Sequence, residues 1–260
     1  MKKIIITADD FGKDIKTNEA IWECAKFGIL TDTCIMANGK AFEDAIEKSH
    51  SMDINIGIHL NIIEGKSLIA NSKSILTDEN GFYNLSYIEM LLLSYNKKFL
   101  KTVEEEFESQ IKKALESGIK PTCLNSHVHV HSIPNIFKIT CYLAKKYGIE
   151  NIRTQREIPY FAGKINPINI IKNILLNIFT LLNNKTVKNH LLDTNNYFIG
   201  VLYTGQMTKD TFLKGIEKLP QNCNCEIILH PTKDENKCAN YKEYLTLINS
   251  KLKSRIKRYN

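Results

Sequence analysis

Short apolar runs alternate with amphipathic stretches along most of the chain. Seven runs have the length and the β-branched content of buried strands, at residues 3–7, 31–36, 54–58, 122–126, 151–153, 198–203 and 226–229. Strands that alternate with helices favour parallel pairing through right-handed crossovers. The pattern therefore predicts an α/β protein of about seven parallel strands in a single domain, closer to a (β/α) barrel than to an open sheet.

Capping residues and helical spacing locate the stretches between the strands. Gly28, Gly118 and Gly148 stand where helices would end. Pro134 suits a first helical turn, and Thr208 is a typical N-cap. The predicted helices span residues 18–27, 41–48, 86–95, 102–116, 134–146, 208–218 and 241–257.

The longest apolar stretch, residues 165–182, belongs to an insertion at about residues 160–197. Pro167, Lys172 and several asparagines make it too polar to span a bilayer. Its apolar residues recur at helical spacing: Ile170, Ile171, Ile174, Leu175, Ile178, Leu181 and Leu182. We expect an amphipathic helix that faces the core or forms a lid. The alternative is an interface for a partner subunit or for a lipid-linked substrate.

The composition is that of a globular protein. Of the 260 residues, 43% are apolar and 24% are charged, which excludes disordered, collagen-like and small disulfide-stabilised proteins. The net charge of +7 comes from lysines that are mostly scattered among acidic residues. The basic run at residues 251–258 is typical of a solvated helix face. No nucleic-acid-binding motif accompanies it, so we expect no nucleic-acid partner.

Cysteine usage and the N-terminal residues bear on the compartment. The seven cysteines include no CxxC pair, and no signal peptide precedes Ile4. We therefore expect reduced thiols and a cytoplasmic location, without stable insertion into a membrane.

Polar residues with chemical potential gather at the predicted carboxyl ends of the strands. They are Asp9 and Asp10 after the first strand, His59 after the third, His127, His129 and His131 after the fourth, and His230 after the seventh. In a (β/α) barrel these ends surround one pocket, and catalytic residues come from several strands. Five of the seven histidines would therefore meet in one place.

Each group also has a structural interpretation. The two aspartates could cap a helix or form a turn, and His59 could be a satisfied core histidine. The run from His127 to His131 is harder to explain this way, because alternation in an extended segment would place all three imidazoles on one side. Two histidines and a carboxylate with an open position suit a divalent cation that is used in catalysis.

Four segments together resemble a known family: Thr7-Ala-Asp-Asp-Phe-Gly12, Gly57-Ile-His-Leu-Asn61, Asn125-Ser-His-Val-His-Val-His131 and Leu229-His-Pro231. They are similar, in order, to the motifs of the YdjC-like carbohydrate deacetylases, which remove acetyl groups from N-acetylated sugars such as chitooligosaccharides. The resemblance extends from Ile4 to the final helix. It implies a distorted (β/α) barrel that hydrolyses the N-acetyl amide of a sugar and releases acetate and the amino sugar.

The resemblance also implies roles for single residues. Asp10, His59 and His127 would bind a divalent metal, Mg²⁺ in the first place and Zn²⁺ as the alternative. Asp9 would be the general base, His230 would protonate the leaving amine, and Arg153 would orient Asp9 or the substrate. Asn125 departs from the family, which usually has an aspartate there, so metal affinity or metal choice is expected to differ.

Three other interpretations remain open on the sequence. The same ligands could serve a metal-dependent phosphoesterase on a similar barrel. The protein could instead bind sugars without catalysis, or the basic tail and the apolar insertion could direct it to a lipid-linked sugar or to a partner protein. The expected partner is an acetylated carbohydrate substrate, and the apolar insertion and the family pattern favour a homodimer.

Overall fold

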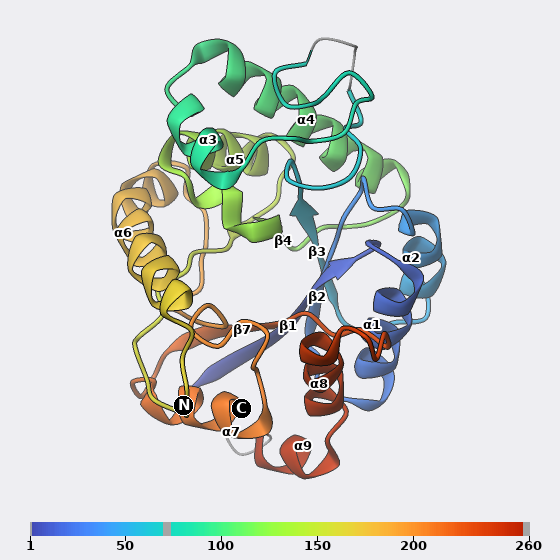
Figure 1. Ribbon diagram of the computed structural model, residues 1–260, viewed down its shortest axis with the longest axis vertical. Helices are drawn as coiled ribbons and strands as arrows, with labels where there is room; N and C mark the ends of the chain where they lie inside the picture. The colour runs from blue at the N-terminus through green and yellow to red at the C-terminus, as the bar shows by residue number, and fades with distance from the viewer. Residues whose placement is uncertain (1, 70–73, 257–260) are drawn as a thin grey trace.

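Seven parallel strands form one sheet in the computed structural model, which describes residues 2–69 and 74–256 (Figure 1). The sheet order is β5-β4-β3-β2-β1-β7-β6. The strands are β1 (Lys3–Phe11), β2 (Asp32–Ile35), β3 (Asn55–Leu60), β4 (Cys123–Ser126), β5 (Asn151–Ile152), β6 (Tyr197–Ile199) and β7 (Asn224–Leu229). All neighbouring pairs in this order are parallel, so the carboxyl ends of the strands lie at one edge.

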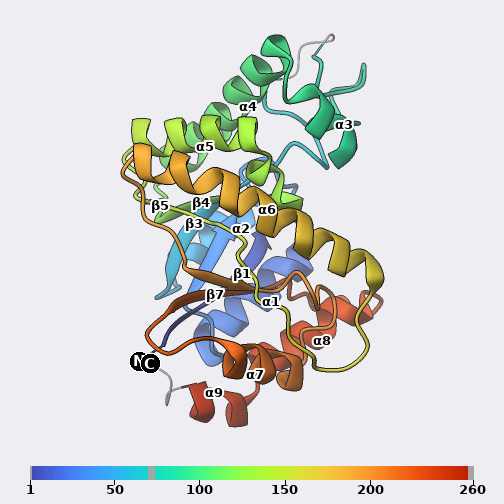
Figure 2. The same ribbon diagram turned by 90° about the vertical axis from the view of Figure 1, so that its left-hand side faces the viewer.

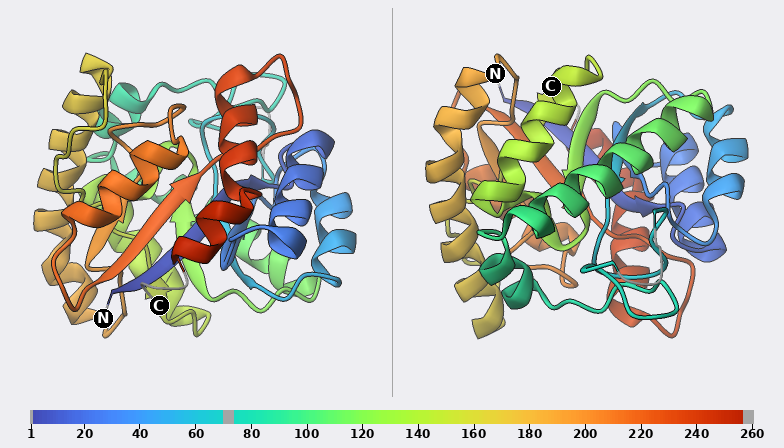
Figure 3. Two further views of the ribbon diagram at one scale, coloured as in Figure 1. Left: turned by 90° about the horizontal axis from the view of Figure 1, so that it is seen from below. Right: turned by 90° about the horizontal axis from the view of Figure 1, so that it is seen from above.

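Helices surround the sheet and bury its outer surface. They are α1 (Ile15–Phe27), α2 (Phe42–Ser49), α3 (Tyr87–Leu93), α4 (Lys97–Glu116), the 3-10 helix η1 (His127–Ser132), α5 (Pro134–Lys146), α6 (Pro167–Asn189), α7 (Lys209–Lys218), α8 (Cys238–Leu247) and α9 (Ser250–Ile256). In Figure 3, α7, α8 and α9 cover one side of the molecule and α4 and α5 cover the other. Apolar stripes on these helices form the core, where Phe107, Phe137 and Phe212 are fully buried.

The sheet curls until its two edge strands approach each other. The N–H of Ile152 donates to the carbonyl of Asp193 at 3.0 Å, and the N–H of Phe198 donates to the carbonyl of Arg156 at 2.8 Å. Between these bonds, the side chain of Asn195 bonds the N–H and the carbonyl of Thr154 at 2.9 and 2.7 Å. The sheet is therefore a curled half-barrel in one domain, and the predicted distorted (β/α) barrel is confirmed.

Most predicted elements are present, and the exceptions have local causes. The strand predicted over residues 198–203 ends at Ile199, because the backbone N–H groups of residues 200–202 donate instead to the buried carboxylate of Glu157, at 2.8 to 3.1 Å. Burial raises the pKa of Glu157 to about 7 although these bonds oppose it. The predicted closing helix, residues 241–257, is two helices, α8 and α9, whereas Lys257 and Arg258 lie outside the described residues.

The amphipathic helix of the insertion is present as α6, but most of its predicted apolar positions face outward, and α6 reaches the core through Leu176, Phe179 and Val187 instead. Ile171, Ile174 and Leu181 are exposed, whereas Asn173 and Asn183 are buried against the protein. Figure 2 shows α6 lying along the outside of the molecule. Within residues 2–69 and 74–256, no helix is both long enough and apolar enough to cross a bilayer.

Candidate metal centre and active site

A bulge in β1 separates the two neighbouring aspartates. Ala8 pairs with Thr33 and Phe11 pairs with Ile35, so Asp9 and Asp10 together face a single residue of β2. Asp10 has a φ of 71°, in the left-handed region that non-glycine residues rarely adopt. The bulge and this strained backbone turn the two carboxylates toward different partners.

Asp10, His59 and His127 converge at the carboxyl ends of β1, β3 and β4. One ligand atom from each lies within 4.8 Å of the others. Oδ1 of Asp10 lies 2.9 Å from Nδ1 of His127 and 3.3 Å from Nε2 of His59. Neither Oδ1 of Asp10 nor Nε2 of His59, both buried, has a hydrogen-bond partner among the described residues. Two imidazoles and a carboxylate with unpaired atoms fit a divalent cation.

Asn125 sets the tautomer of His59. Its Oδ1 lies 2.6 Å from Nδ1 of His59, and its amide nitrogen donates to Sγ of Cys34 at 2.9 Å. An amide oxygen only accepts hydrogen bonds, so the proton of His59 must be on Nδ1. Nε2 then keeps a free lone pair on the side of Asp10, which is the arrangement that a metal ligand needs.

Asp9 is held by a buried ion-pair network. The guanidinium of Arg153 donates to both oxygens of Asp9, at 2.6 and 2.9 Å, and to both oxygens of Glu226, at 3.0 and 2.6 Å. Burial alone would raise the pKa of Asp9, but the Arg153 charge and its hydrogen bonds outweigh burial and hold this pKa far below its usual range. Asp9 is therefore a carboxylate whose orientation is fixed by two parallel bonds.

His230 follows β7 and is paired with a glutamate of α8. The carboxylate of Glu243 accepts the backbone N–H of His230 at 2.6 Å and lies 3.7 Å from its Nδ1. Burial lowers the pKa of His230, but Glu243, Asp10 and Asp9 outweigh it, and the net effect raises this pKa above its ordinary value. The imidazole borders a cavity of about 140 Å³ that Asp10, Lys13 and Lys237 also line. A histidine whose protonated form is favoured by its neighbours thus lies beside the candidate metal site.

The histidine run has a different conformation from the predicted one. It forms the 3-10 helix η1, in which Val128 and His129 have φ values of 51° and 57°. This left-handed backbone turns successive side chains to different sides, so the expectation that three imidazoles share one face is wrong. His127 reaches Asp10, whereas His129 packs on Phe198, with ring centroids 5.6 Å apart.

His131 has a supporting position instead of a place in the pocket. Its Nδ1 lies 2.7 Å from Oγ of Ser126, and its Nε2 lies 3.1 Å from the backbone carbonyl of Arg153. Burial lowers the pKa of His131 to about 3 and also lowers the pKa of His129. Both imidazoles are therefore neutral near pH 7, and His131 helps to hold the backbone at Arg153.

Three acidic residues of the site were not predicted from the sequence. Glu226 and Glu243 are the partners of Arg153 and His230 described above. The third, Glu64, lies after β3, where its carboxylate contacts Nζ of Lys13 at 2.7 Å and lies 3.6 Å from Nε2 of His127. The interaction with His127 is the largest of several that lower the pKa of Glu64 to about 2. Glu226 lies in a strand, Glu243 in a helix and Glu64 in a loop, and none of the three belongs to a sequence motif that would have identified it as part of the site.

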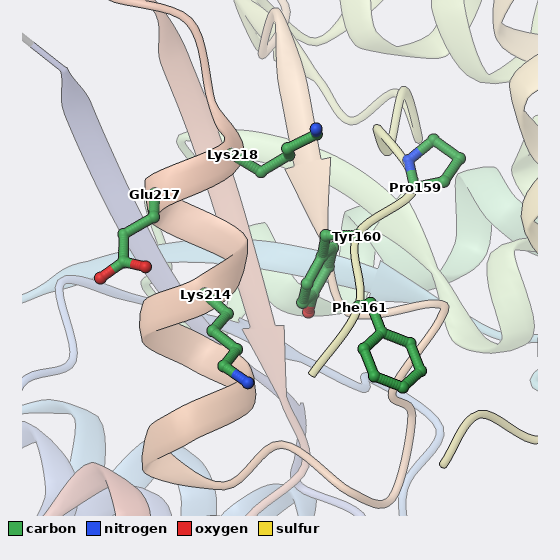
Figure 4. A pocket seen from close by; sticks show the side chains of 6 residues that line it. All are labelled: Pro159, Tyr160, Phe161, Lys214, Glu217 and Lys218. Atoms are coloured by element: carbon green, nitrogen blue, oxygen red, sulfur yellow. The ribbon is translucent and has the colours of Figure 1, made fainter. Parts of the chain in front are cut away.

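A further pocket lies away from these residues. It has a volume of about 650 Å³ and is formed by Pro159, Tyr160 and Phe161, which precede α6, together with α7 (Figure 4). Lys214, Glu217 and Lys218 are its α7 residues. None of the candidate catalytic or metal-binding residues lines it, so the chemistry of the site belongs to the smaller cavity.

The fold and the site define an α/β half-barrel protein with a candidate divalent-metal centre at the carboxyl ends of its strands. The sequence profile of the family described as YdjC-like protein matches residues 3–258. The chain therefore belongs to the YdjC-like family.

Several relatives are named carbohydrate deacetylase. The one from Thermoanaerobacter pseudethanolicus is 29% identical over 94% of this chain and 86% of its own length. The one from Clostridium beijerinckii is 33% identical over 60% of this chain and 66% of its own length. A crystal structure from Enterococcus faecalis, named as a candidate for cellobiose-phosphate cleavage, has a TM-score of 0.79 at 22% identity and covers 99% of this chain and 95% of its own. That likeness supports the fold.

Proposed function

We propose that this protein is a metal-dependent carbohydrate deacetylase that hydrolyses the N-acetyl group of an acetylated sugar and releases acetate and the amino sugar. One observation carries the proposal. An ion-paired carboxylate (Asp9) and a histidine whose pKa is raised (His230) flank the three metal-type ligands, and two buried ligand atoms, Oδ1 of Asp10 and Nε2 of His59, lack hydrogen-bond partners among the described residues. Membership of the YdjC-like family and the names of the relatives support the sugar amide as the bond that is cleaved.

Asp10, His59 and His127 would hold the metal. When bound, a divalent cation polarises the acetyl carbonyl and acidifies water. The ligand set of two imidazoles and one carboxylate suits Zn²⁺ as well as Mg²⁺, and magnesium stays the prediction from the sequence. The Nδ1–H tautomer that Asn125 imposes on His59 is what keeps Nε2 available for this role.

Asp9 would act as the general base. Its two bonds to Arg153 fix its orientation at the edge of the site, and they also make it a weak base, because the guanidinium stabilises the ionised form. Arg153 therefore contributes position more than basicity. Its second carboxylate partner, Glu226, balances the charge, so Asp9 can accept a proton without leaving the guanidinium unpaired.

His230 would act as the general acid. The amine of a cleaved amide is a poor leaving group, and a proton that is delivered to its nitrogen lowers that barrier. Glu243 stabilises the imidazolium and helps to raise the pKa of His230 above its ordinary value. The side chain of His230 is 23% exposed, so part of the ring remains open to the cavity that it lines.

Release of acetate tests the proposed function. The purified protein is incubated with a panel of N-acetylated sugars and with Mg²⁺ or Zn²⁺, and free acetate is measured. Sugar phosphates are assayed in parallel for released phosphate. We expect acetate that depends on the metal and is lost in Asp10→Asn. Metal-dependent phosphate release without acetate would favour the phosphoesterase, and sugar binding without either product would favour a catalytically silent protein.

Three finer expectations stay predictions from the sequence: a homodimer, a cytoplasmic location, and a lid or interface role for the insertion at about residues 160–197. Light scattering of the purified protein tests the first. Cell fractionation tests the second. The third concerns α6, whose exposed face is considered next.

A further inference from the structure

The exposed side of α6 is unusually apolar for a surface helix. Its buried side is mixed. Leu176, Phe179 and Val187 join the core. Beside them, Asn173 donates to the buried carboxylate of Glu157 at 3.0 Å, and Asn183 donates to the carbonyl of Ser132 at 2.8 Å. Its outward residues are aliphatic. We define the outer face of α6 as Ile168, Ile171, Ile174, Ile178, Leu181 and Leu182, all of which are exposed. Six large aliphatic side chains in one stripe form an apolar patch that an ordinary solvated helix avoids.

The charged residues of this segment of the chain have one sign. Between Glu157 and Asp193 the sequence contains no acidic residue, but it contains Lys164, Lys172, Lys185 and Lys188. All four lysines are exposed. In the part of the chain that the structure describes, none of them is in an ion pair with a carboxylate. Helical spacing places Lys185 at the end of the aliphatic stripe, so whatever covers the stripe also meets positive charge.

We propose that the outer face of α6 docks on the surface of an anionic lipid bilayer, with the helix lying in the plane of the headgroups. A helix with an aliphatic face, flanking lysines and no acidic residue has the features of an interfacial helix. Acyl chains accept the isoleucines and leucines, and anionic headgroups attract the lysines. The helix lies on the bilayer and does not cross it, in agreement with its many asparagines.

Charge complementarity favours the bilayer over a second copy of this chain. A two-fold interface brings the same patch of both subunits together. The lysines of one α6 would then meet the lysines of the other, and this stretch of chain offers no carboxylate to pair with them. A bilayer that contains phosphatidylglycerol supplies the missing negative charge across the whole patch.

The pocket in front of α7 adds a second contact of the same kind. Phe161, which precedes α6, is 77% exposed, and Lys214 and Lys218 line the same pocket (Figure 4). An exposed aromatic ring beside lysines suits the headgroup region. Glu217 also lines this pocket, so we assign the main attraction to α6, where carboxylates are absent from the sequence.

Vesicle flotation tests the proposal with the full chain and without any sugar, so its outcome is independent of the deacetylase activity. The vesicles are phosphatidylcholine alone, or phosphatidylcholine and phosphatidylglycerol in equal parts. The apolar variant is Ile171→Gln with Leu181→Gln, whose parent residues are 66% and 70% exposed. Its matched control on α3 is Ile88→Gln with Leu92→Gln, whose parent residues are 69% and 70% exposed.

A charge variant completes the set, with its own control. It combines Lys172→Glu and Lys185→Glu on α6, and the control combines Lys97→Glu and Lys98→Glu on α4. All four of these lysines are exposed. Circular dichroism checks that each variant is folded, and any variant that is not folded is replaced by the corresponding alanine form.

We expect the wild type to float with the anionic vesicles and to be released by high salt. The apolar variant should lose at least about tenfold in vesicle affinity, and the charge variant roughly fivefold for each lysine, whereas the two controls should bind like the wild type. No flotation of the wild type, or equal losses in the α3 control, would overturn the proposal. Failure to float together with a dimer that the apolar variant dissociates would assign the face to a second copy instead.

Discussion

Asp9 and Asp10 are neighbours in the chain, yet their carboxylates have separate partners. Asp9 accepts two bonds from Arg153, and Asp10 lies 2.9 Å from Nδ1 of His127. The bulge in β1 and the left-handed backbone at Asp10 cause this division. Substitutions at the two positions should therefore have different consequences, although the side chains are identical.

Removal of any one metal ligand should strip most of the bound metal. Asp10→Asn, His59→Ala and His127→Ala each leave two ligands, which hold a divalent ion poorly. His190→Ala is the matched control, because His190 lies at the end of α6 and bonds the carbonyl of Thr186 at 2.9 Å. Elemental analysis of the purified variants measures the effect. Full metal occupancy in all three ligand variants would remove the proposed site.

Asp9→Asn should keep the metal and the fold but lose roughly 10²–10⁴-fold in the rate of deacetylation. An amide cannot accept the proton that the proposed base accepts. Glu226→Gln is the control, because it also removes one carboxylate from Arg153, and we expect it to cost less than about tenfold in rate. The comparison requires kcat/KM and metal content for both variants. Equal losses of rate would mean that Asp9 acts only by holding Arg153.

Arg153→Met should destabilise the protein by about 3–5 kcal/mol, because it leaves two buried carboxylates without their cation. Asp9 and Glu226 both depend on this guanidinium. Arg156→Met is the control, since Arg156 is exposed and lies over the ring of Tyr197 at 4.8 Å, and its cost should stay within about 0.5 kcal/mol. Urea denaturation measures both. A small effect at Arg153 would mean that the carboxylates find other partners.

Asn125→Asp should tighten metal binding by roughly 10–100-fold. A carboxylate accepts the Nδ1–H of His59 more strongly than an amide does, and this raises the basicity of Nε2. Asn125→Leu, which removes the acceptor, should weaken binding. Both variants lose the bond to Cys34, so the difference between them isolates the acceptor. Titration calorimetry with Mg²⁺ and Zn²⁺ measures the affinities, and equal affinities in both variants would show that this bond has no influence on the metal.

The sequence was sufficient for the parts of the site that depend on strand order. Parallel strands must end at one edge of the sheet, so the positions of His59, His127 and His230 could be predicted from periodicity alone. The acidic partners of His230 and Arg153 could not, because Glu243 and Glu226 come from elements with no motif. The conformation of the histidine run was missed because it depends on two residues with positive φ, Val128 and His129.

The orientation of α6 was also beyond the sequence pattern. The helical spacing of its apolar residues predicted the helix correctly. The apolar side of a surface helix usually faces the core, so the predicted stripe was expected to point inward. In α6 the inner side is shared by core residues and by buried asparagines that have partners, as Asn173 has in Glu157 and Asn183 in the carbonyl of Ser132, so the predicted apolar stripe lies outside. These partners come from distant segments and become visible only in the folded chain.

The pair of His230 and Glu243 predicts how the reaction depends on pH. A general acid works in its protonated form, so the rate should fall as the pH rises through the pKa of His230. Burial lowers this pKa, but the interactions with Glu243, Asp10 and Asp9 outweigh burial, and Glu243 contributes most among them. The net effect raises the pKa of His230 above the ordinary 6.5. The basic limb of the kcat/KM profile should therefore lie above that value. Glu243→Gln removes the neighbouring charge and should move this limb to lower pH, whereas in a residually active His230→Ala variant the limb should flatten.

The control for this prediction is Glu217→Gln, because Glu217 is an exposed glutamate of α7 that lies outside the cavity of His230; its profile should match the wild type. Metal content is measured in every variant, since loss of the ion would also change the profile. An unchanged basic limb in both Glu243→Gln and His230→Ala, with the metal retained, would assign the acid role to another group. His129 and His131 are poor substitutes, because burial lowers the pKa of both and leaves them neutral where the reaction runs. Lys13 and Lys237, which line the cavity beside His230, would then be the next residues to replace.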